Sequence, residues 1–490
     1  MSKVVVIGGG MGGMAAAIRL AARGHQVELF ERRGELGGKL AERTRDGYAF
    51  GLGPALLTLP EVFDDLAAEA GRKLADLVTL VPVDPVCRYR FSDGSVLDAR
   101  ADPAEMAAAV GRLIPGQEGA WLRYYQWGRR CWEASERAFF AGPLEPRALA
   151  GRQAGLSDLA ASAPGRTLAG HARRFFSDPR LIQYACRYAT YSGSSPYLAP
   201  AAVGCIPYLE HAHGAWYVRG GLTRLAGALA GLLAGLGVHV HTGTAVSRVL
   251  TDGRRVQGVI AAGTRVAADA VVCDADAARL YTELCPSPRR LQRIRRAGPS
   301  SSGFLLLAAV RGPVPGLAHH NVVFSADYRA EFADIFRRGQ PPADPSVYVS
   351  CSAVDDPAAA PPGGQNLAVL VNVPAGGTAA WDVRPAGYTE VVLAKLAAAG
   401  LDVRGRLEFT ERLTPDDFRQ RYDGWRGSIY GTPHHGRLAP FRRPGNRGPV
   451  AGLYLVGGSV HPGGGLPLVA IGARIVAGMI TADQRAGRLG

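Results

Sequence analysis

A glycine-rich turn close to the first residue constrains the fold more than any other feature of the sequence. Residues 4–7 are all apolar, which predicts a buried strand, and glycines follow with the spacing Gly-x-Gly-x-x-Gly. The alanine-rich segment after the turn predicts a helix that ends near Gly24. In such a unit, free N–H groups and the positive end of the helix dipole meet at the turn, where they can bind the phosphates of a dinucleotide. The predicted contacts at this turn are Gly8, Gly10, Gly12 and Gly13.

The segment after the second predicted strand indicates which dinucleotide binds. That strand covers residues 26–30 and ends at Glu31, whose carboxylate can accept hydrogen bonds from ribose hydroxyls. The motif Gly37-Gly38-Lys39 favours FAD over NAD, because an extra loop and a cation suit the extended FAD pyrophosphate. NADP is disfavoured, since Glu31 would repel a 2′-phosphate held by Arg32 or Arg33. The alternative is an ordinary surface turn. The predicted FAD contacts of this segment are Glu31, Arg32, Gly38 and Lys39.

Composition bounds the remaining possibilities. The chain has 490 residues with 47% hydrophobic and 20% charged, which predicts a folded protein of two or three domains. Seven scattered cysteines without a C-x-x-C motif argue against a disulfide framework and a zinc site, and favour a reducing cytoplasm. No apolar run reaches the roughly 20 residues that span a bilayer. The net charge of +14 reflects either an arginine-rich composition or a face for anionic membranes, and no nucleic-acid-binding motif is present.

The order of predicted elements favours an α/β fold in which a Rossmann-like FAD-binding domain is interleaved with a substrate domain of mixed sheet and helices. Within the helical insertion, residues 102–140 mix aromatic side chains with arginines, which fits either a core or tunnel wall or contact with a membrane. Residues 143–164 read as a loop or flap. The predicted blocks are FAD-binding residues 1–100, a helical insertion 101–215, FAD-binding residues 216–285, a substrate sheet 286–420 and FAD-binding residues 421–490.

Further cofactor contacts are predicted away from the first turn. The Gly53-Pro54 turn exposes backbone N–H groups, and the strand near Val246 offers backbone groups to the adenine. A second strand–glycine turn–helix unit near the end of the chain places a helix N-terminus under the flavin ring, where negative charge accumulates on reduction. The predicted contacts are Gly53, Pro54, Val246, Asp274, Gly457, Gly458, Leu466, Pro467 and Val469.

Taken together, these motifs resemble the flavin-dependent carotenoid desaturases of the bacterial and fungal phytoene desaturase type. The similarity covers nearly the whole length, and its most specific parts are Ser195-Pro196-Tyr197 and His319-His320-Asn321, whereas the terminal motifs are shared with flavin amine oxidases. The turn around Gly457-Gly458-Ser459 is similar to that of the hydroxycarotenoid 3,4-desaturases. The resemblance implies FAD as the cofactor and an acyclic carotenoid as the substrate. It also implies attachment to the inner face of the cell membrane, and quinone or oxygen as the electron acceptor.

The resemblance also implies a reaction, the transfer of a hydride from the substrate to the flavin and of a proton to a nearby group or water. Glu210 and His461 are the candidate proton acceptors: Glu210 lies among Tyr, His and Trp residues that favour a raised pKa, and His461 lies in the turn expected to face the flavin. Either residue could instead be a hydrogen-bonded structural residue. The rival functions are a flavin amine oxidase, for which a chain with four lysines is poorly suited, a carotenoid oxygenase or isomerase, and a non-catalytic carotenoid-binding protein.

Overall fold

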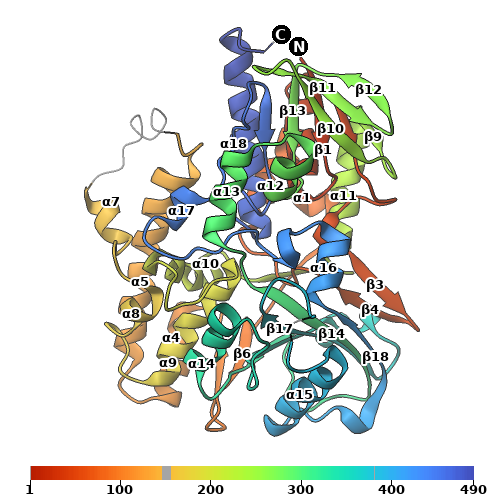
Figure 1. Cartoon of the computed structure of the whole chain (residues 1–490). Helices are drawn as coiled ribbons and strands as arrows, with labels where there is room; N and C mark the ends of the chain where they lie inside the picture. The colour runs from red at the N-terminus through yellow and green to blue at the C-terminus, as the bar shows by residue number, and fades with distance from the viewer. Residues whose placement is uncertain (1, 146–155, 380, 490) are drawn as a thin grey trace.

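A five-stranded parallel sheet lies at one end of the molecule and contains segments from both ends of the chain (Figure 1). The computed structural model describes residues 2–145, 156–379 and 381–489. The strand order is β19-β13-β1-β2-β9, so the first strand lies in the middle. The carboxyl ends of parallel strands meet at one edge, which gathers the segments that follow them. The strands are β1 (Lys3–Ile7), β2 (Gln26–Phe30), β9 (His239–His241), β13 (Ala270–Cys273) and β19 (Leu453–Leu455).

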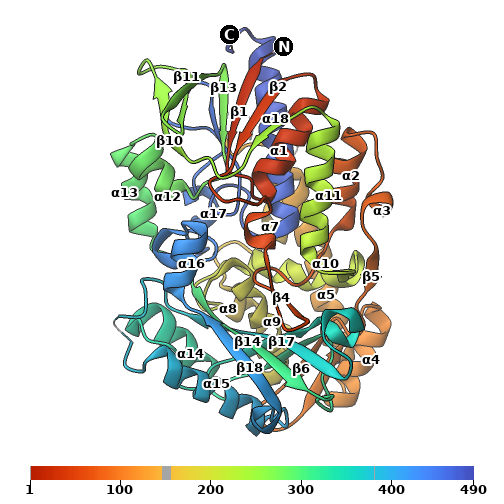
Figure 2. The same ribbon diagram turned by 90° about the vertical axis from the view of Figure 1, so that its right-hand side faces the viewer.

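Three apolar helices, α1 (Met11–Ala22), α11 (Leu222–Gly235) and α18 (Leu466–Arg485), pack together beside this sheet (Figure 2). α18 is long and apolar enough to cross a membrane by length and composition, but 67% of its apolar window is buried against the rest of the chain. It therefore acts as a core helix. The other face of the sheet carries the antiparallel strands β10 (Val246–Thr251), β11 (Val256–Ala261) and β12 (Thr264–Ala267) and the short helix α12 (Ala277–Arg279).

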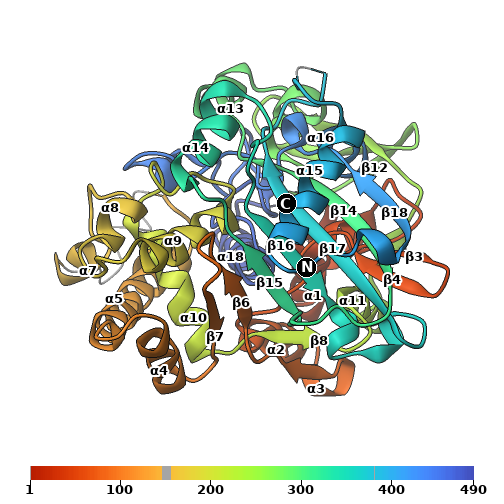
Figure 3. The ribbon, with the colours of Figure 1, turned by 90° about the horizontal axis from the view of Figure 1, so that it is seen from below.

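A seven-stranded mixed sheet lies at the end of the molecule opposite the termini (Figures 1 and 3). Its order is β18-β14-β17-β16-β15-β6-β7. One face is covered by α15 (Pro385–Ala398), whose Val392 and Leu396 pack against Val369 and Val371. The other face looks toward the dinucleotide domain. The strands are β6 (Cys87–Arg90), β7 (Val96–Ala99), β14 (Ser302–Arg311), β15 (His320–Val323), β16 (Val347–Cys351), β17 (Gly364–Val373) and β18 (Leu407–Leu413).

The predicted end of the first FAD-binding block at residue 100 is wrong. Strand β6 pairs in parallel with β15, with Tyr89 opposite Val322, and β7 extends the same sheet. Residues 87–99 therefore belong to the substrate domain. The partner strand lies more than 200 residues further along the chain, and no local pattern reports such a pairing.

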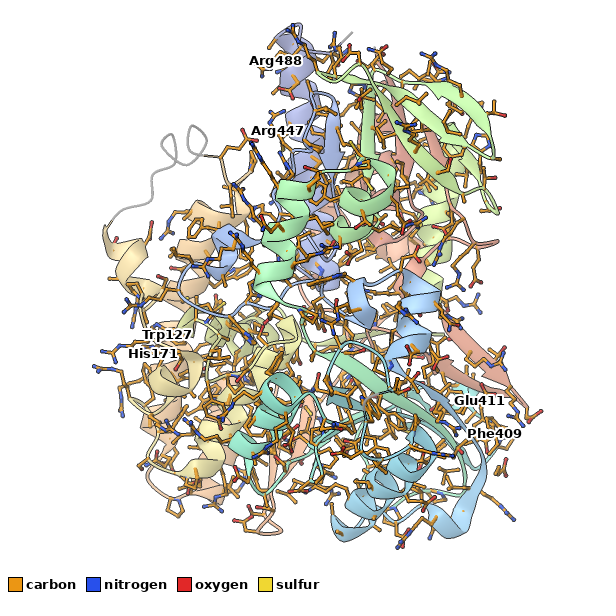
Figure 4. The ribbon with its side chains drawn as sticks, in the orientation of Figure 1. Trp127, His171, Phe409, Glu411, Arg447 and Arg488 are labelled. Carbon is orange, nitrogen blue, oxygen red and sulfur yellow. The ribbon has the colours of Figure 1, made fainter. Side chains whose placement is uncertain are left out.

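The helical insertion forms a layer beside the seven-stranded sheet (Figure 3). The predicted helix over 102–140 is divided at Pro115-Gly116 into α4 (Pro103–Leu113) and α5 (Glu118–Ser135), and α5 continues into a π-helical turn (Glu136–Phe140). The aromatic stripe is core: Trp121 and Trp132 are buried, and Trp127 lies 4.3 Å from the His171 ring between centroids (Figure 4). The other helices are α7 (Leu156–Ala161), α8 (Leu168–Ala172), α9 (Pro179–Arg187) and α10 (Ile206–Ala212). The middle of the predicted loop at 143–164 lies outside the described residues.

Shorter elements connect these layers. The hairpin β3–β4 packs against β17, and β5 pairs with β8 between the two domains. The connecting elements are β3 (Glu42–Arg45), β4 (Tyr48–Gly51), α2 (Pro60–Glu69), α3 (Leu74–Leu77), β5 (Leu80–Pro82), β8 (Trp216–Val218), α13 (Pro288–Ala297), α14 (Tyr328–Ala333), α16 (Pro415–Tyr422) and α17 (Ala439–Arg442).

Candidate active site

The two glycine turns from opposite ends of the chain meet at the edge of the parallel sheet. A Cβ atom on Gly12 would lie 3.0 Å from the backbone nitrogen of Gly457 and 3.1 Å from the Val469 side chain. Gly38 lies against the first turn in the same way, since its Cβ would be 3.1 Å from the Cα of Gly10. All three glycine motifs of the sequence therefore form one cradle of bare backbone.

Side chains are excluded from this cradle by direct overlap. A Cβ on Gly13 would overlap the carbonyl oxygen of Gly8, and a Cβ on Gly53 would overlap the carbonyl oxygen of Lys39. Gly8 and Gly457 have φ angles of 98° and 99°, which side chains rarely adopt. Helix α1 begins directly after Gly10, so its free N–H groups point into the cradle. The cradle has the backbone approach and the positive helix end that a dinucleotide pyrophosphate needs.

Glu31 is positioned beside the cradle by backbone hydrogen bonds. Its side chain is buried, and its two carboxylate oxygens accept from the N–H groups of Gly9 at 2.7 Å and Arg33 at 2.8 Å. These bonds orient the carboxylate at the end of β2, where a ribose is expected. Arg32 points elsewhere: it pairs with Asp423 at 2.9 Å and donates to the carbonyl oxygen of Arg421. Its predicted contact with FAD stays a prediction.

Asp274 lies between the two glycine turns. It follows β13, and its carboxylate faces Gly10, Gly12 and Gly457. Burial raises the pKa of this carboxyl group to about 7, and the nearby Glu31 raises the pKa further, while Lys39 and the backbone N–H groups of Gly13 and Gly10 lower it. An acidic group therefore titrates near neutrality at the predicted pyrophosphate site.

The other predicted cofactor residues surround the cradle. Lys39 is held under the turns by a hydrogen bond from its Nζ to the carbonyl oxygen of Ile429 at 2.6 Å, and burial lowers its pKa. Gly458 follows Gly457 in the second turn, and Leu466 and Pro467 form the first turn of α18. Val246 is buried in the core that contains Phe30 and is paired with Ala261.

Two cavities lie over the same face of the seven-stranded sheet. The larger, of about 240 Å³, is bounded by Pro54 and by Gly220-Gly221. Its floor includes Ser350 and Ala368, and the floor of the smaller cavity includes Tyr348 and Leu370. The register places Tyr348 opposite Leu370 and Ser350 opposite Ala368, so these side chains share one face of β16 and β17. This face is the floor of the candidate substrate site.

Residues 430–435 connect the floor with the C-terminal glycine turn. The Tyr430 ring packs against Gly464, and His434 approaches Gly463. The motif at 193–197 holds this segment: the Ser194 hydroxyl accepts from the His434 N–H at 2.8 Å, and the Ser195 N–H donates to His435 Nε2 at 2.9 Å. Tyr430 was not predicted from the sequence, because its role depends on a contact with a turn more than 30 residues away.

Glu210 and His461 are both buried, with exposed fractions of 1%. The two carboxylate oxygens of Glu210 accept hydrogen bonds of 2.7 Å from the hydroxyls of Tyr188 and Tyr191, and burial raises its pKa. His461 Nε2 lies 3.2 Å from the carbonyl oxygen of Gly142, and its ring packs edge-on against Phe139. Neither residue lines one of the two cavities described above. Their roles as proton acceptors stay predictions.

The fold and the cradle define a dinucleotide-dependent oxidoreductase with a separate substrate domain. The family model described as flavin containing amine oxidoreductase matches residues 11–478, and the chain belongs to this family. FAD is its cofactor, and the bare cradle with Glu31 beside it fits that group. The predicted fold class and cofactor are confirmed.

Relatives and solved structures agree with this assignment. The chain is 35% identical to a 4,4′-diapolycopene oxygenase of Methylomonas sp, with 98% of each chain covered. It is 36% identical to a hydroxyneurosporene desaturase of Cereibacter sphaeroides, again over 98% of each chain, and 35% identical to a zeta-carotene-forming phytoene desaturase of Myxococcus xanthus, over 97% of this chain and 93% of the relative. The structure of an oxidoreductase from Methanosarcina mazei superposes with a TM-score of 0.66 at 19% identity, over 97% of this chain and 99% of that one. The last similarity concerns the fold alone.

Proposed function

We propose that the protein is an FAD-dependent desaturase that introduces carbon–carbon double bonds into an acyclic carotenoid. The observation that carries the proposal is the near-complete similarity to proteins named as desaturases of phytoene and hydroxyneurosporene. The cavities beside the flavin-binding turns supply a place for such a substrate. When bound, FAD supplies the acceptor for the hydride.

The protein's own contribution is to position a long chain and exclude water. The sheet floor presents Tyr348, Leu370 and Ala368 toward the cradle, and Tyr430 closes the space beside Gly464. Glu210 is the nearest buried carboxylate that the sequence predicts as a proton acceptor. Its two tyrosine hydrogen bonds hold it in one orientation.

The four lysines argue against an amine oxidase with a lysine–water pair. Lys39 is bound to a backbone carbonyl under the turns, Lys3 pairs with Glu28 at 2.9 Å and Lys395 pairs with Asp344. None of the four lysines lines one of the two described cavities. An oxygenase is the stronger second candidate, because the Methylomonas relative carries that name at 35% identity.

We also propose that the protein attaches to an anionic membrane surface through an exposed apolar patch formed by Leu198, Leu438 and Phe441. Their side chains are 48%, 56% and 59% exposed, and the Gly436 N–H donates to the Leu198 carbonyl, which joins the two segments. Arg437 and Arg442 are exposed within the patch, and residues 193–200 and 429–443 contain no Asp or Glu. The patch begins four residues after His434, which touches the flavin-side turn. A hydrocarbon substrate therefore has a short path from lipid to the site.

Product mass separates the candidate reactions. The holoprotein is incubated in lipid vesicles with phytoene, with lycopene and with a 1-hydroxylated acyclic carotenoid, using quinone or oxygen as the acceptor. A desaturase removes two hydrogens and shifts the polyene absorption to longer wavelength. Gain of oxygen in the product would instead assign an oxygenase, and an unchanged mass with a changed spectrum would assign an isomerase.

A further inference from the structure

The smaller cavity on the sheet floor has a polar lining that the desaturation of a hydrocarbon does not use. Its volume is about 10 Å³, which is roughly enough for one water-sized group. Asn372 lies on its wall and connects it to the flavin side, because Asn372 accepts from the Ser301 hydroxyl and the Ser301 N–H donates to the carbonyl of Gly193. A Cβ on Gly193 would in turn touch the Tyr430 ring. The lining residues are Arg187, Thr190, Val322, Tyr328, Glu331, Ser346, Tyr348, Leu370 and Asn372.

Two hydrogen-bond donors face this cavity without an acceptor. Within the described residues, the guanidinium of Arg187 makes no hydrogen bond and no ion pair within 4.0 Å, and its nearest aromatic rings, Tyr191 and Tyr348, are 5.9 Å away. In the same part of the chain, the amide NH₂ of Asn372 donates to no residue. Buried donors of this kind are usually satisfied, so the missing partner is expected to come from a bound molecule.

The nearby carboxylates balance the charge of Arg187 but are already occupied. Glu331 accepts from the hydroxyls of Ser325 and Ser346, at 2.6 Å each, and from the Ser346 N–H at 3.1 Å. Glu210 accepts from two tyrosine hydroxyls, as described above. A cation is therefore stabilised in the cavity while its N–H groups remain available.

We propose that this cavity binds an oxygen atom of the substrate, so that the preferred carotenoid carries a hydroxyl or carbonyl group at its end rather than being a pure hydrocarbon. The inference rests on the proposed function and names its substrate class. The cavity offers free donors, and its carboxylates are saturated, which selects an acceptor oxygen. A hydrocarbon end would leave the guanidinium without a partner. The connection through Ser301 and Gly193 to Tyr430 puts the bound oxygen close to the flavin side, which suits a hydroxyl on C1 when the bond to be oxidised joins C3 and C4.

The test measures binding and turnover separately. Vesicles containing either a 1-hydroxylated acyclic carotenoid or the matching hydrocarbon are titrated with the FAD-loaded protein, and quenching of flavin fluorescence reports binding. We expect the wild type to bind the hydroxylated compound at least about tenfold more tightly, the size of effect typical of a hydrogen bond to a charged group. Arg187→Met is expected to remove this preference and to change hydrocarbon binding less than about threefold.

Two further variants keep the result interpretable. Asn372→Leu removes the second donor at similar volume and is expected to reduce the preference by a smaller factor, even if Arg187→Met does not fold. Arg329→Met is the matched control, because Arg329 is exposed and lies over the Tyr197 ring, outside the cavity lining.

An equal loss of both ligands in Arg187→Met would show a structural role and overturn the proposal. An unchanged preference in both cavity variants would show that the cavity holds a structural water only, and would overturn it as well. Product analysis judges the proposed function independently: if the wild type removes hydrogens from neither compound, that function fails, while the binding preference still decides on the cavity.

Discussion

The dinucleotide domain and the substrate domain build their sites in opposite ways. The first uses backbone: three glycine motifs meet with no room for a Cβ, and α1 presents its free N–H groups. The second uses side chains, such as Arg187 and Asn372, that come from a helix and a strand almost 200 residues apart. A site of bare backbone tolerates no added atom, whereas a site of side chains tolerates replacement but changes its ligand. The substitutions below test this contrast, beginning with the largest expected effect.

Gly13→Val is expected to abolish FAD binding. The new Cβ would overlap the carbonyl oxygen of Gly8, so the turn must open and the cradle is lost. The measurement is flavin absorbance per chain after purification. Gly478→Ala is the matched control, because this glycine lies in α18 and a Cβ there would meet nothing within 4 Å. Full flavin content in Gly13→Val would contradict a backbone-defined site.

Glu210→Gln is expected to retain FAD but to lower the turnover by about 100-fold or more if Glu210 accepts the proton, the usual contribution of a general base. The amide still accepts hydrogen bonds from Tyr188 and Tyr191, so the fold is preserved. Product formation and flavin content are measured together. Full turnover with bound FAD would remove Glu210 from the mechanism, and His461→Gln tests the second predicted acceptor in the same assay.

Asp274 is expected to make FAD affinity depend on pH. Its pKa is raised to about 7, and Glu31, Lys39 and Asp276 are the other charged groups at this point. Because the pyrophosphate is negative, FAD favours the protonated carboxyl group. The affinity is therefore highest below about pH 7 and falls as the pH rises through that value, by up to about tenfold per pH unit.

Asp274→Asn is expected to flatten this pH profile, measured by titrating the apoprotein with FAD. Asp269→Asn, at the other end of β13, is the control, because Asp269 instead accepts from the backbone N–H of Lys3. A profile that stays steep in Asp274→Asn would assign the dependence to another group. The same raised pKa means that the native apoprotein holds a proton that the unfolded chain releases, so this group's contribution to stability falls as the pH rises toward 7.

Phe441→Ser is expected to have the smallest effect, a loss of about tenfold in partition onto anionic vesicles. Removal of one inserted aromatic side chain sacrifices roughly 2 kcal/mol of apolar transfer energy. Val240→Ser, in β9 of the dinucleotide domain, serves as the control. Equal binding of the wild type to anionic and neutral vesicles would remove the contribution of Arg437 and Arg442, and an unchanged partition of Phe441→Ser would remove the proposed patch.

The contrast between the domains also explains what the sequence predicts. Glycine spacing, a preceding apolar run and a following helix are local, so Gly8, Gly10 and Gly13 and the second turn at Gly457 could be identified before the structure. Arg187 looks like any helix-ending arginine in the sequence. Its significance depends on Glu331 and Asn372, which the sheet brings to it, and on hydrogen bonds that occupy the neighbouring carboxylates.

The same limit explains the other differences. Strands β6 and β7 join a sheet whose remaining strands are made much later in the chain. The aromatic stripe on α5 is compatible with either core or membrane until its neighbours are known, and Trp121 is in fact buried. The exposed patch at Leu438 and Phe441 lies in a short segment without a helical pattern, so amphipathicity does not reveal it.

The position of β19 has a consequence for biosynthesis. A growing polypeptide presents its first glycine turn as soon as synthesis begins, but the partner turn at Gly457 leaves the ribosome only when the chain is nearly finished. Cofactor capture is consequently the last step of maturation. Prematurely terminated products remain colourless, and cells short of riboflavin accumulate full-length chains whose first and last segments have no ligand to join them.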